Sequence, residues 1–398
     1  MLGWHRQRRR QSTRSRAPTE SDPWFERRRW GCSRTCAFGT RARIALLIAL
    51  LVLGLVGNGG ARAESRDAAA AKAAAASFLA HYALSTGRID RIDQGGDTVS
   101  AGQAYGMLMT VALGERQRFA LIWRWTRIHL KRGDGLLASH WRGGRVVDAK
   151  SASDADLDAA RALILAGERF HARAYGQDGV VMARAILAHE TERLGRSLVL
   201  LAGSWARKPA IVDPGYWAPR TFELLTAATH DQRFALLEQG AVSLARDLTA
   251  NAPHLPPDWT TVSATGVPQP IAGPPGRGRE PTARYSLDAA RLPVRFAEAC
   301  DARSSQIPAA MWPFFSAQPP NTIGFAYSLD GHLLAPQQTA TVLVGAAAAA
   351  QSSGQTAARD RLLTQADAIN TRFPTYFGSA WVALGRLELE TALLGSCS

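Results

Sequence analysis

The sequence predicts an all-α fold in which six helical hairpins close into a double ring, with inner helices surrounded by outer ones. Apolar residues recur at helical spacing in almost every segment after Glu64, and little of the chain alternates as a strand would. Long and short links alternate between the predicted helices, as expected when helices pair into hairpins. A solenoid is the alternative arrangement, but it would not concentrate acids and aromatics at alternate helix starts.

The predicted helices are twelve in number, and their ends are placed to within a few residues. They cover residues 67–84, 101–113, 116–131, 154–171, 179–194, 217–229, 233–249, 287–299, 305–317, 338–352, 356–371 and 378–394. The links after odd-numbered helices are the long ones. In a double ring these links share one face with the starts of the even-numbered helices. Ala101, Asp154, Tyr216, Asp288 and Tyr376 all fall there, so this face is the expected site.

The longest link, residues 251–285, contains eight prolines. A link of this length without helices is usually functional or disordered. We expect a small strand pair around Trp259–Val267 and a flexible insertion at GPPGRGRE, residues 273–280.

The N-terminal part of the chain is not globular in composition. Residues 1–43 are an Arg-rich leader, and residues 44–56 form an uncharged apolar run, shorter than the about 20 residues of a membrane span. This run suits the core of a secretory signal, with a small-x-small cleavage site at residues 61–63. A membrane anchor over residues 44–58 is the alternative. Both interpretations place the domain of residues 64–398 outside the cytoplasm, as a secreted, periplasmic or envelope protein.

Most of the formal net charge of +14 lies in this leader. Residues 1–63 hold thirteen arginines and three acids, a net of +10, so the basic balance is weak evidence for nucleic-acid binding. Cys32 and Cys36 lie in the leader and lack further ligands at metal-site spacing. Cys300 and Cys397 either pair in an oxidising compartment or remain two lone thiols.

The stretch that carries the chemistry is KSASDADLDAARALILAGERF, residues 150–170. Ser153 followed three residues later by Asp156 predicts a capping box at a helix start. Asp154 and Asp156 either complement the positive end of this helix or act as paired carboxylates in a cleft, as sugar-cleaving enzymes require. Asp288 and Arg291, one helical turn apart, form either a surface pair or a carboxylate held by a guanidinium.

Several stretches together resemble glycoside hydrolase family 8, which includes endoglucanases, chitosanases, xylanases and the cellulase that accompanies bacterial cellulose synthesis. They are SAGQAYGMLMTVALGER (100–116), SASDADLDAARALILAG (151–167), YSLDAARLPVR (285–295), and, more weakly, VDPGYWAP (212–219) and TYFGSAWVALGRLEL (375–389). The resemblance spans residues 67–394 in the family's order. It implies an (α/α)6 barrel, which agrees with the twelve predicted helices.

The resemblance implies inverting cleavage of a β-1,4-linked glucan, in which one carboxylic acid protonates the leaving oxygen and a second carboxylate activates water. Asp154 matches the aspartate under the sugar at the cleavage point, with Asp156 in support. Asp288 matches the general base, and Arg291 is able to hold it. The proton donor is the Glu of the family motif SEGQxYGM, and Ala101 stands in its place. Alanine has no proton to give, although general acid catalysis typically contributes about 10²–10⁴-fold.

The expected substrate-binding residues come from these motifs and from the long links. They are Asp156, Arg291, Gln103, Tyr105, Trp141, Tyr216 and Tyr376. Tyr105 either lines the cleft or packs in the inner ring. Trp141, in a long link, is the best candidate for stacking on sugar, and Tyr216 is the next. The other stacking candidates, of which most are expected to be core residues, are Trp205, Trp217, Trp312 and Trp381.

Replacements for the missing acid are not obvious in the sequence. Asp97 lies outside the predicted helix, and Glu115 lies four turns along it, although a loop could bring Asp97 or Asp93 into the cleft. His140 and His171 lack clear ligand partners and are expected to be structural.

The sequence thus favours an exported endoglucanase-type glycosidase, with a catalytically impaired glycan-binding protein as the alternative. A purely structural helical protein is a third, remote class. No cofactor or metal is expected, since inverting hydrolysis needs none and no GxSxG, HExxH or Walker motif occurs. The expected partner is β-glucan or a related polysaccharide, with no nucleic acid and with membrane contact only through the N-terminal segment. A monomer is expected.

Overall fold

A computed structural model describes residues 66–275, 281–319 and 321–395. These residues belong to one compact unit, residues 58–398. The Arg-rich leader, the apolar run, Cys32, Cys36, Cys397 and part of the GPPGRGRE insertion lie outside the described residues. Cys300 is disulfide-bonded, so the alternative of two lone thiols is wrong. Within the described part of the chain, none of the helices combines the length and the apolar character needed to cross a bilayer.

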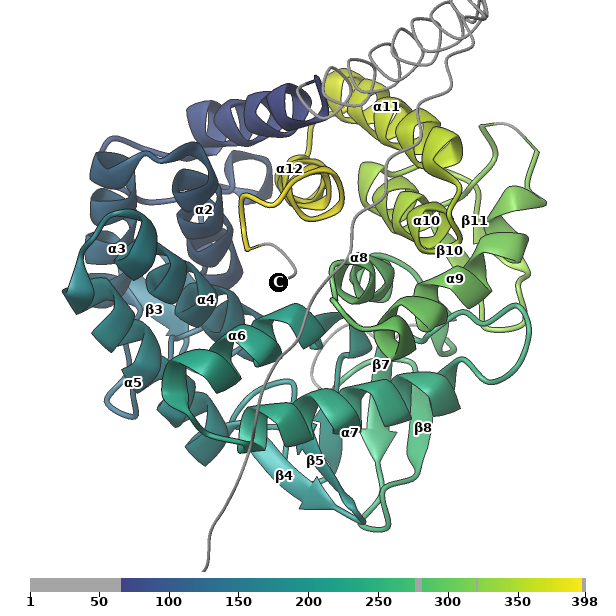
Figure 1. The fold of residues 1–398 in the computed structure, drawn as a ribbon, viewed down its shortest axis with the longest axis horizontal. Helices are drawn as coiled ribbons and strands as arrows, with labels where there is room; N and C mark the ends of the chain where they lie inside the picture. Colours follow the sequence, from purple (N-terminus) through teal and green to yellow (C-terminus); the bar gives the residue numbers. More distant parts are fainter. Residues whose placement is uncertain (1–65, 276–280, 320, 396–398) are drawn as a thin grey trace, which may run out of the picture. The chain divides into compact units, whose positions relative to one another are not determined.

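The described residues of this unit contain twelve helices, as the sequence predicted, and they form an inner and an outer ring (Figure 1). The inner ring consists of α2 (Ser100–Leu113), α4 (Ser153–Arg169), α6 (Pro219–Thr229), α8 (Arg291–Ala297), α10 (Ala340–Ser352) and α12 (Tyr376–Glu390). The outer ring consists of a helix over residues 66–82, α3 (Arg116–His129), α5 (Arg173–His189), α7 (Arg233–Leu248), α9 (Ala302–Ser316) and α11 (Thr356–Arg372). Each inner helix contacts the next, and α12 contacts α2, so the ring closes into an (α/α)6 barrel.

The two rings differ in how the helices are buried. α10 is buried continuously from Ala340 to Ala350, because it is surrounded by α8, α9, α11 and α12. Its small side chains allow close packing: a Cβ on Gly345 would lie 2.7 Å from the carbonyl oxygen of Ala290. α11 in the outer ring buries residues on one face only. A helix that is apolar all round belongs inside, and an amphipathic one covers it.

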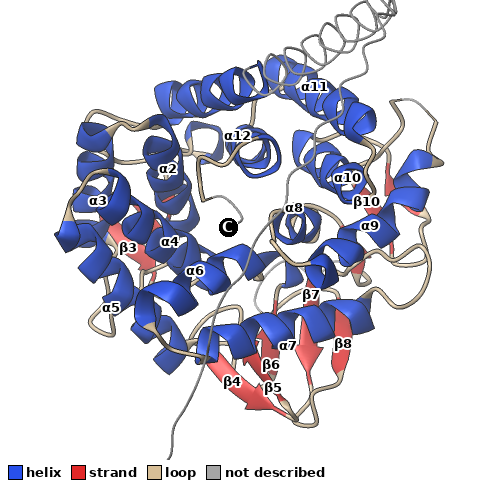
Figure 2. Cartoon of the chain, in the orientation of Figure 1, coloured by secondary structure: helices blue, strands red, loops and turns tan. Residues whose placement is uncertain are grey.

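Small antiparallel sheets occupy the long links (Figure 2). Their strands are β1 (Thr98–Val99), β2 (His140–Arg142) and β3 (Arg145–Asp148); β4 (Thr191–Leu194) and β5 (Ser197–Leu200); β6 (Ala210–Val212), β7 (Trp259–Val262) and β8 (Pro268–Ile271); and β9 (Arg284–Tyr285), β10 (Ala326–Ser328) and β11 (Leu333–Ala335). The expected strand pair in the longest link is present as β7 and β8. Two short 3₁₀ helices, η1 (Ile92–Gln94) and η2 (Pro214–Tyr216), complete the links.

Three local expectations from the sequence are corrected. The capping box at α4 does not form: the Ser153 hydroxyl donates to the carbonyl of Leu201, and the Asp156 carboxylate accepts from the backbone of Leu137. The fifth helix ends at His189, because the β4–β5 hairpin turns at Gly195, which has φ +57°. The eighth helix starts at Arg291, so residues 287–290 form a turn instead of its first turn.

A buried ion network lies in the middle of the inner ring. Arg295 of α8 donates to Asp158 of α4 at 2.5 Å and to Glu388 of α12 at 2.8 Å. Arg161 of α4 donates to Glu298, just after α8, at 2.8 Å. The two arginines are 3% and 0% exposed. The network therefore ties α4, α8 and α12 together across the ring.

Removing one charge from this network is expected to destabilise the fold strongly. Arg295→Met keeps apolar volume but leaves the buried Asp158 carboxylate without its guanidinium and Glu388 with Arg161 alone, at 3.9 Å. Breaking a buried pair in this way costs about 3–5 kcal/mol. The free energy of unfolding from a urea titration checks this. As a control, Arg233→Met breaks an exposed pair with Asp231, for which a change of at most about 1 kcal/mol is expected. Equal losses of unfolding free energy in both variants would contradict the stabilising role of the Arg295 network.

Candidate active site

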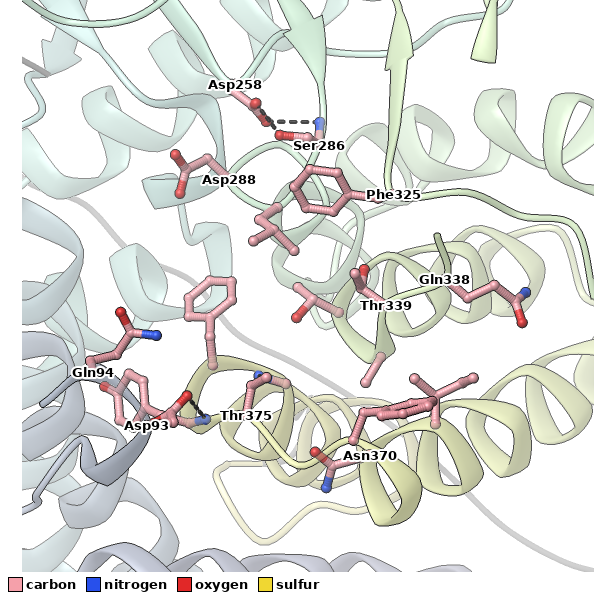
Figure 3. Close-up of a pocket in the computed structure, with 18 of the residues that line it drawn as sticks. Asp93, Gln94, Asp258, Ser286, Asp288, Phe325, Gln338, Thr339, Asn370 and Thr375 are labelled. Carbon is pink, nitrogen blue, oxygen red and sulfur yellow. Dashed lines mark hydrogen bonds between the residues drawn. The ribbon is translucent and has the colours of Figure 1, made fainter. Parts of the chain in front are cut away.

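A cleft crosses the face of the barrel where the inner helices begin. It consists of two adjoining pockets of about 590 and 350 Å³, which share Arg91, Asp288, Tyr376 and Phe377 in their walls. In the larger pocket, Asp288 and Asp258 lie on one wall and Asp93 on the other (Figure 3). The size and the mixed apolar and polar walls are those of a binding site for an organic ligand.

Arg291, the first residue of α8, gathers three aspartates at the floor of this cleft. Its Nη1 donates to Asp154 Oδ2 at 2.9 Å, and its Nη2 donates to Asp213 Oδ2 at 2.6 Å and to Asp288 Oδ1 at 2.8 Å. The side chains of Arg291, Asp154 and Asp213 are 3%, 9% and 0% exposed, whereas that of Asp288 is 32% exposed. Asp288 is therefore the carboxylate of this cluster that reaches solvent in the cleft.

Burial affects the pKa of Asp154, Asp213 and Arg291 in this cluster. Burial raises the pKa of Asp154 and Asp213, and Arg291 opposes the rise in both cases. Burial alone would lower the pKa of Arg291, but the three carboxylates outweigh it and hold that pKa well above its ordinary value. The guanidinium is thus permanently charged, and it favours the ionised form of each carboxylate beside it.

The turn that carries Asp288 is built by its neighbours. Asp258 Oδ1 accepts from the backbone N–H groups of Ser286 and Ala289, both at 2.9 Å. This clamp explains why α8 starts late. Trp259 Nε1 donates to Asp288 Oδ2 at 3.1 Å, so both carboxylate oxygens of Asp288 are held. The side chain is thereby fixed with its exposed edge toward the cleft.

Asp213 is a site residue that the sequence reasoning missed. It precedes η2, and its Oδ1 accepts from the backbone of Gly215 at 2.8 Å while its Oδ2 binds Arg291. A Cβ at Gly215 would lie 2.1 Å from the carbonyl oxygen of Asp288, so only glycine allows this approach. The sequence signal that could have identified Asp213 is in the matched stretch VDPGYWAP, where Asp-Pro-Gly marks a turn.

The three predicted tyrosines all line the cleft. Tyr216 lies under Arg291, with the guanidinium 4.8 Å from its ring centre. Tyr376 opens α12 and reaches toward α2, where a Cβ at Gly102 would lie 2.5 Å from its hydroxyl. Tyr105 is almost fully buried, and its ring packs edge-on against Trp381. For Tyr105, both alternatives hold in part, since it packs in the inner ring and borders the cleft.

Gln103 and Asp156 lie beneath the cleft, which corrects their expected contact with substrate. Gln103 is fully buried and bonds to the backbone of Ile89 and to the Thr126 hydroxyl, so it ties α2 to its neighbours. Asp156 is fully buried beside Glu190, the residue that follows α5. Burial and Glu190 raise the pKa of Asp156. Burial raises the pKa of Glu190 to about 8, so near neutral pH the two carboxyls share a proton.

Trp141, the best stacking candidate from the sequence, does not line the cleft. Its ring centre lies 5.4 Å from that of Trp125 in α3, and the Arg88 guanidinium lies 5.1 Å from it. His140 of β2 lines the cleft, whereas Trp141 packs on Trp125 and His129 of α3; the β2–β3 register shifts between these two residues. Among the other tryptophans, Trp205 lines a third pocket beside the cleft, Trp217 and Trp381 are core residues, and Trp312 packs against the core.

The cleft has aromatic walls that the sequence did not single out. Trp259, Phe325, Phe373 and Phe377 line the larger pocket. Phe373 is 61% exposed, which is unusual for a phenylalanine. The positions of these four aromatic residues depend on links that lie far apart in the sequence.

Ala101 lines the smaller pocket together with Asp154, Asp288 and His140. The possible replacement acids have other partners. Asp97 accepts two bonds from Arg91, both at 2.7 Å, and one from His140 Nε2 at 2.6 Å. Asp93 accepts from the backbone of Tyr376, and Glu115, just before α3, pairs with Arg118 in the first turn of that helix. His140 thus lines the cleft and also has a partner in Asp97, and its structural role stays a prediction.

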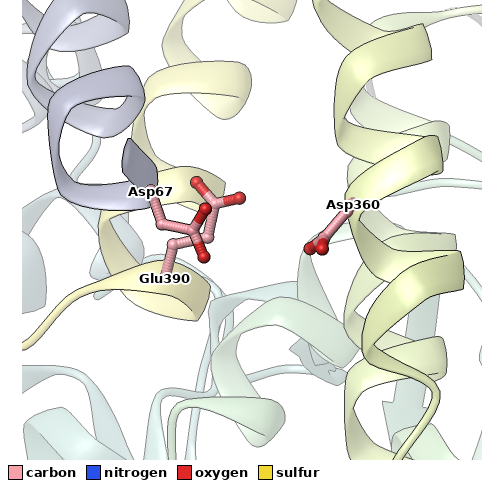
Figure 4. A group of neighbouring side chains, drawn as sticks. All are labelled: Asp67, Asp360 and Glu390. Carbon is pink, nitrogen blue, oxygen red and sulfur yellow. The ribbon is translucent and has the colours of Figure 1, made fainter. Parts of the chain in front are cut away.

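Two groups of acids among the described residues have metal-like spacing, and both are paired with arginine. Asp67, Asp360 and Glu390 (Figure 4) contact Arg359 and Arg386. In the second group, which consists of Glu223, Glu238 and Asp301, Glu223 pairs with Arg220 and Asp301 pairs with Arg303. Both groups lie outside the walls of the cleft. Neither offers the chemistry of the site.

Comparison with known proteins gives a consistent result. The model of the family described as Glycosyl hydrolases family 8 matches residues 48–388. A probable endoglucanase of Novacetimonas hansenii is 31% identical over 228 residues, which are 55% of this chain and 64% of the relative. Endoglucanase A of Acetivibrio thermocellus is 27% identical over 274 residues, 65% of this chain and 54% of the relative. The chain thus spans less than two thirds of the length of these relatives.

Solved structures agree in fold. The endo-beta-1,4-glucanase CMCax from Acetobacter xylinum superposes with a TM-score of 0.67 at 25% identity, covering 80% of this chain and 98% of that chain. A Beta-1,3-1,4-glucanase from Paenibacillus sp. X4 gives a TM-score of 0.74 at 20% identity, covering 82% and 92%. The second likeness concerns the fold alone.

The shared proton beneath the cleft predicts a pH effect on stability. The folded chain keeps the proton of Glu190 up to about pH 8, whereas an unfolded chain releases it near 4.5. Between these values the folded state binds more protons, so the contribution of Glu190 to stability falls as the pH rises. Glu190→Gln, which imitates the protonated form, is expected to lose less stability between pH 5 and pH 8.5 than the parent. Parallel decline in urea titrations at both pH values would contradict the shared proton.

Proposed function

Because the chain belongs to the glycosyl hydrolases family 8, we propose that it is an exported glycosidase that cleaves β-1,4-linked glucan internally and with inversion. One observation carries the proposal: Arg291 holds Asp154, Asp213 and Asp288 together at the floor of an open cleft with aromatic walls. Inverting glycosidases need a carboxylate that can activate water beside the sugar. The names of the related endoglucanases support the choice of glucan.

In this proposal Asp288 is the general base. Its carboxylate is partly exposed and is oriented by Arg291 and Trp259, so it can accept a proton from a water that attacks the anomeric carbon. Asp154 lies deeper in the same pocket, under the position of the sugar, where its negative charge stabilises the positive charge that develops on the ring. The apolar faces of Trp259 and Phe377 suit stacking against sugar rings.

The alternative is a glycan-binding protein with impaired catalysis. Ala101 favours it, because the family's proton donor is absent from the start of α2. The cleft, its aromatic walls and the aspartate cluster would then serve recognition alone. The two functions differ in turnover, not in binding.

The hydrolase proposal predicts that the purified chain lowers the viscosity of soluble carboxymethyl cellulose. Asp288→Asn is expected to reduce the rate of release of reducing ends by about 10²–10⁴-fold, since general base catalysis is lost. Proton NMR of the first products should show the α-anomer. The matched control is Asp330→Asn, on an exposed hairpin outside the cleft, which should leave the rate unchanged.

The same assays distinguish a glycan-binding protein from a hydrolase. A parent chain that never lowers the viscosity, yet releases heat on titration with cello-oligosaccharides, would be a binding protein. A parent chain without turnover and without binding would refute both functions.

The proposed location follows from the leader. We expect export through the apolar run at residues 44–56 and removal of residues 1–63. N-terminal sequencing of the protein recovered outside the cytoplasm should begin at Glu64. An intact N-terminus in the membrane fraction would support the anchor over residues 44–58 instead.

A further inference from the structure

The place left by Ala101 has a neighbour that can carry a proton. β1 runs directly into α2, and its Val99 is paired with His140 of β2. The backbone of Ser100 donates to the carbonyl of Ser139 at 3.0 Å, which fixes β2 against the start of α2. As a result, His140 and Ala101 line the same pocket as Asp154 and Asp288.

His140 is held as an acid–base group would be. Its Nε2 contacts Asp97 Oδ2 at 2.6 Å, and Arg91 holds both oxygens of Asp97 at 2.7 Å. The Asp97 side chain is 4% exposed, while that of His140 is 30% exposed. No hydrogen bond joins Nδ1 of His140 to any residue in the described ranges. A carboxylate on one ring nitrogen orients an imidazole and stabilises its protonated form.

We propose that His140 is the proton donor of this site in place of the glutamate that Ala101 replaces, with Asp97 and Arg91 as positioning residues. The inference rests on the proposed function. In the step, the imidazolium of His140 gives its proton to the glycosidic oxygen as the bond from that oxygen to the anomeric carbon breaks. The leaving sugar keeps the bonding electron pair and departs as a neutral alcohol. Water bonds to the anomeric carbon and gives its proton to Asp288, and solvent returns that proton to His140.

The nearby carboxyl groups fit the role less well. Burial would raise the pKa of Asp97, but Arg91 and His140 hold it below its usual value, so this group stays ionised. Asp148 also borders the pocket, but it lies on β3, one strand further from α2 than His140. Its Oδ1 accepts from the backbone of Lys150. An imidazole, in contrast, is the side chain that most often transfers protons in enzymes.

The test compares two leaving groups in the full chain. Carboxymethyl cellulose has a poor leaving group that needs protonation, whereas 2,4-dinitrophenyl β-cellotrioside does not. His140→Ala is expected to reduce kcat/KM on the polysaccharide by about 10²–10⁴-fold, with less than about tenfold loss on the aryl glycoside. The control His332→Ala removes another histidine that contacts an aspartate, from an exposed hairpin, and should change neither rate. Adding Ala101→Glu to the His140→Ala chain should restore cleavage of the polysaccharide.

Each other outcome overturns the proposal. If the parent is active and His140→Ala keeps full activity on the polysaccharide, the proton comes from elsewhere, and selective loss in Asp148→Asn would identify that carboxyl. Equal losses on both substrates would assign His140 a structural role. A parent inactive on both substrates would instead refute the proposed hydrolase itself, which distinguishes the two failures.

Discussion

The contact of Arg291 with Asp154, Asp213 and Asp288 is the constraint on which the site depends. Asp154 lies in the first turn of α4, Asp213 precedes η2, and Asp288 lies in the turn before α8. A buried guanidinium is tolerated only when its charge is matched. The contact requires α4, η2 and α8 to come together, so assembly of the cleft floor depends on the packing of these three elements.

The cleft floor continues into the core through a second tier of ion pairs. Asp158 follows Asp154 by one turn in α4, and Arg295 follows Arg291 by one turn in α8, so both pairs join the same two helices. The deeper pair also reaches α12 through Glu388. The angle between α4 and α8 is thus fixed at two levels.

The long links between the helices position the remaining side chains of the cleft. The sheet β1–β2–β3 brings His140 next to the start of α2, and the turn clamped by Asp258 points Asp288 into the cleft. A change of one residue at position 101 therefore need not abolish proton transfer, because the adjoining strand offers an imidazole at the same wall. The inner helices form the rigid frame, and the links determine which side chains face the cleft.

The sequence by itself determined the twelve helices, their pairing into a ring, and the aspartates at the start of α4, because helical periodicity and turn residues are local signals. It also pointed to Arg291, one helical turn from Asp288. Only the tertiary structure decided that Asp213 completes the cluster, since its partner lies far along the chain. The placement of β2 was likewise decided by pairing, since Val99 at the start of α2 pairs with His140 and Thr98 pairs with Trp141. Local periodicity predicts the frame, whereas the direction in which a polar side chain points is set by distant partners.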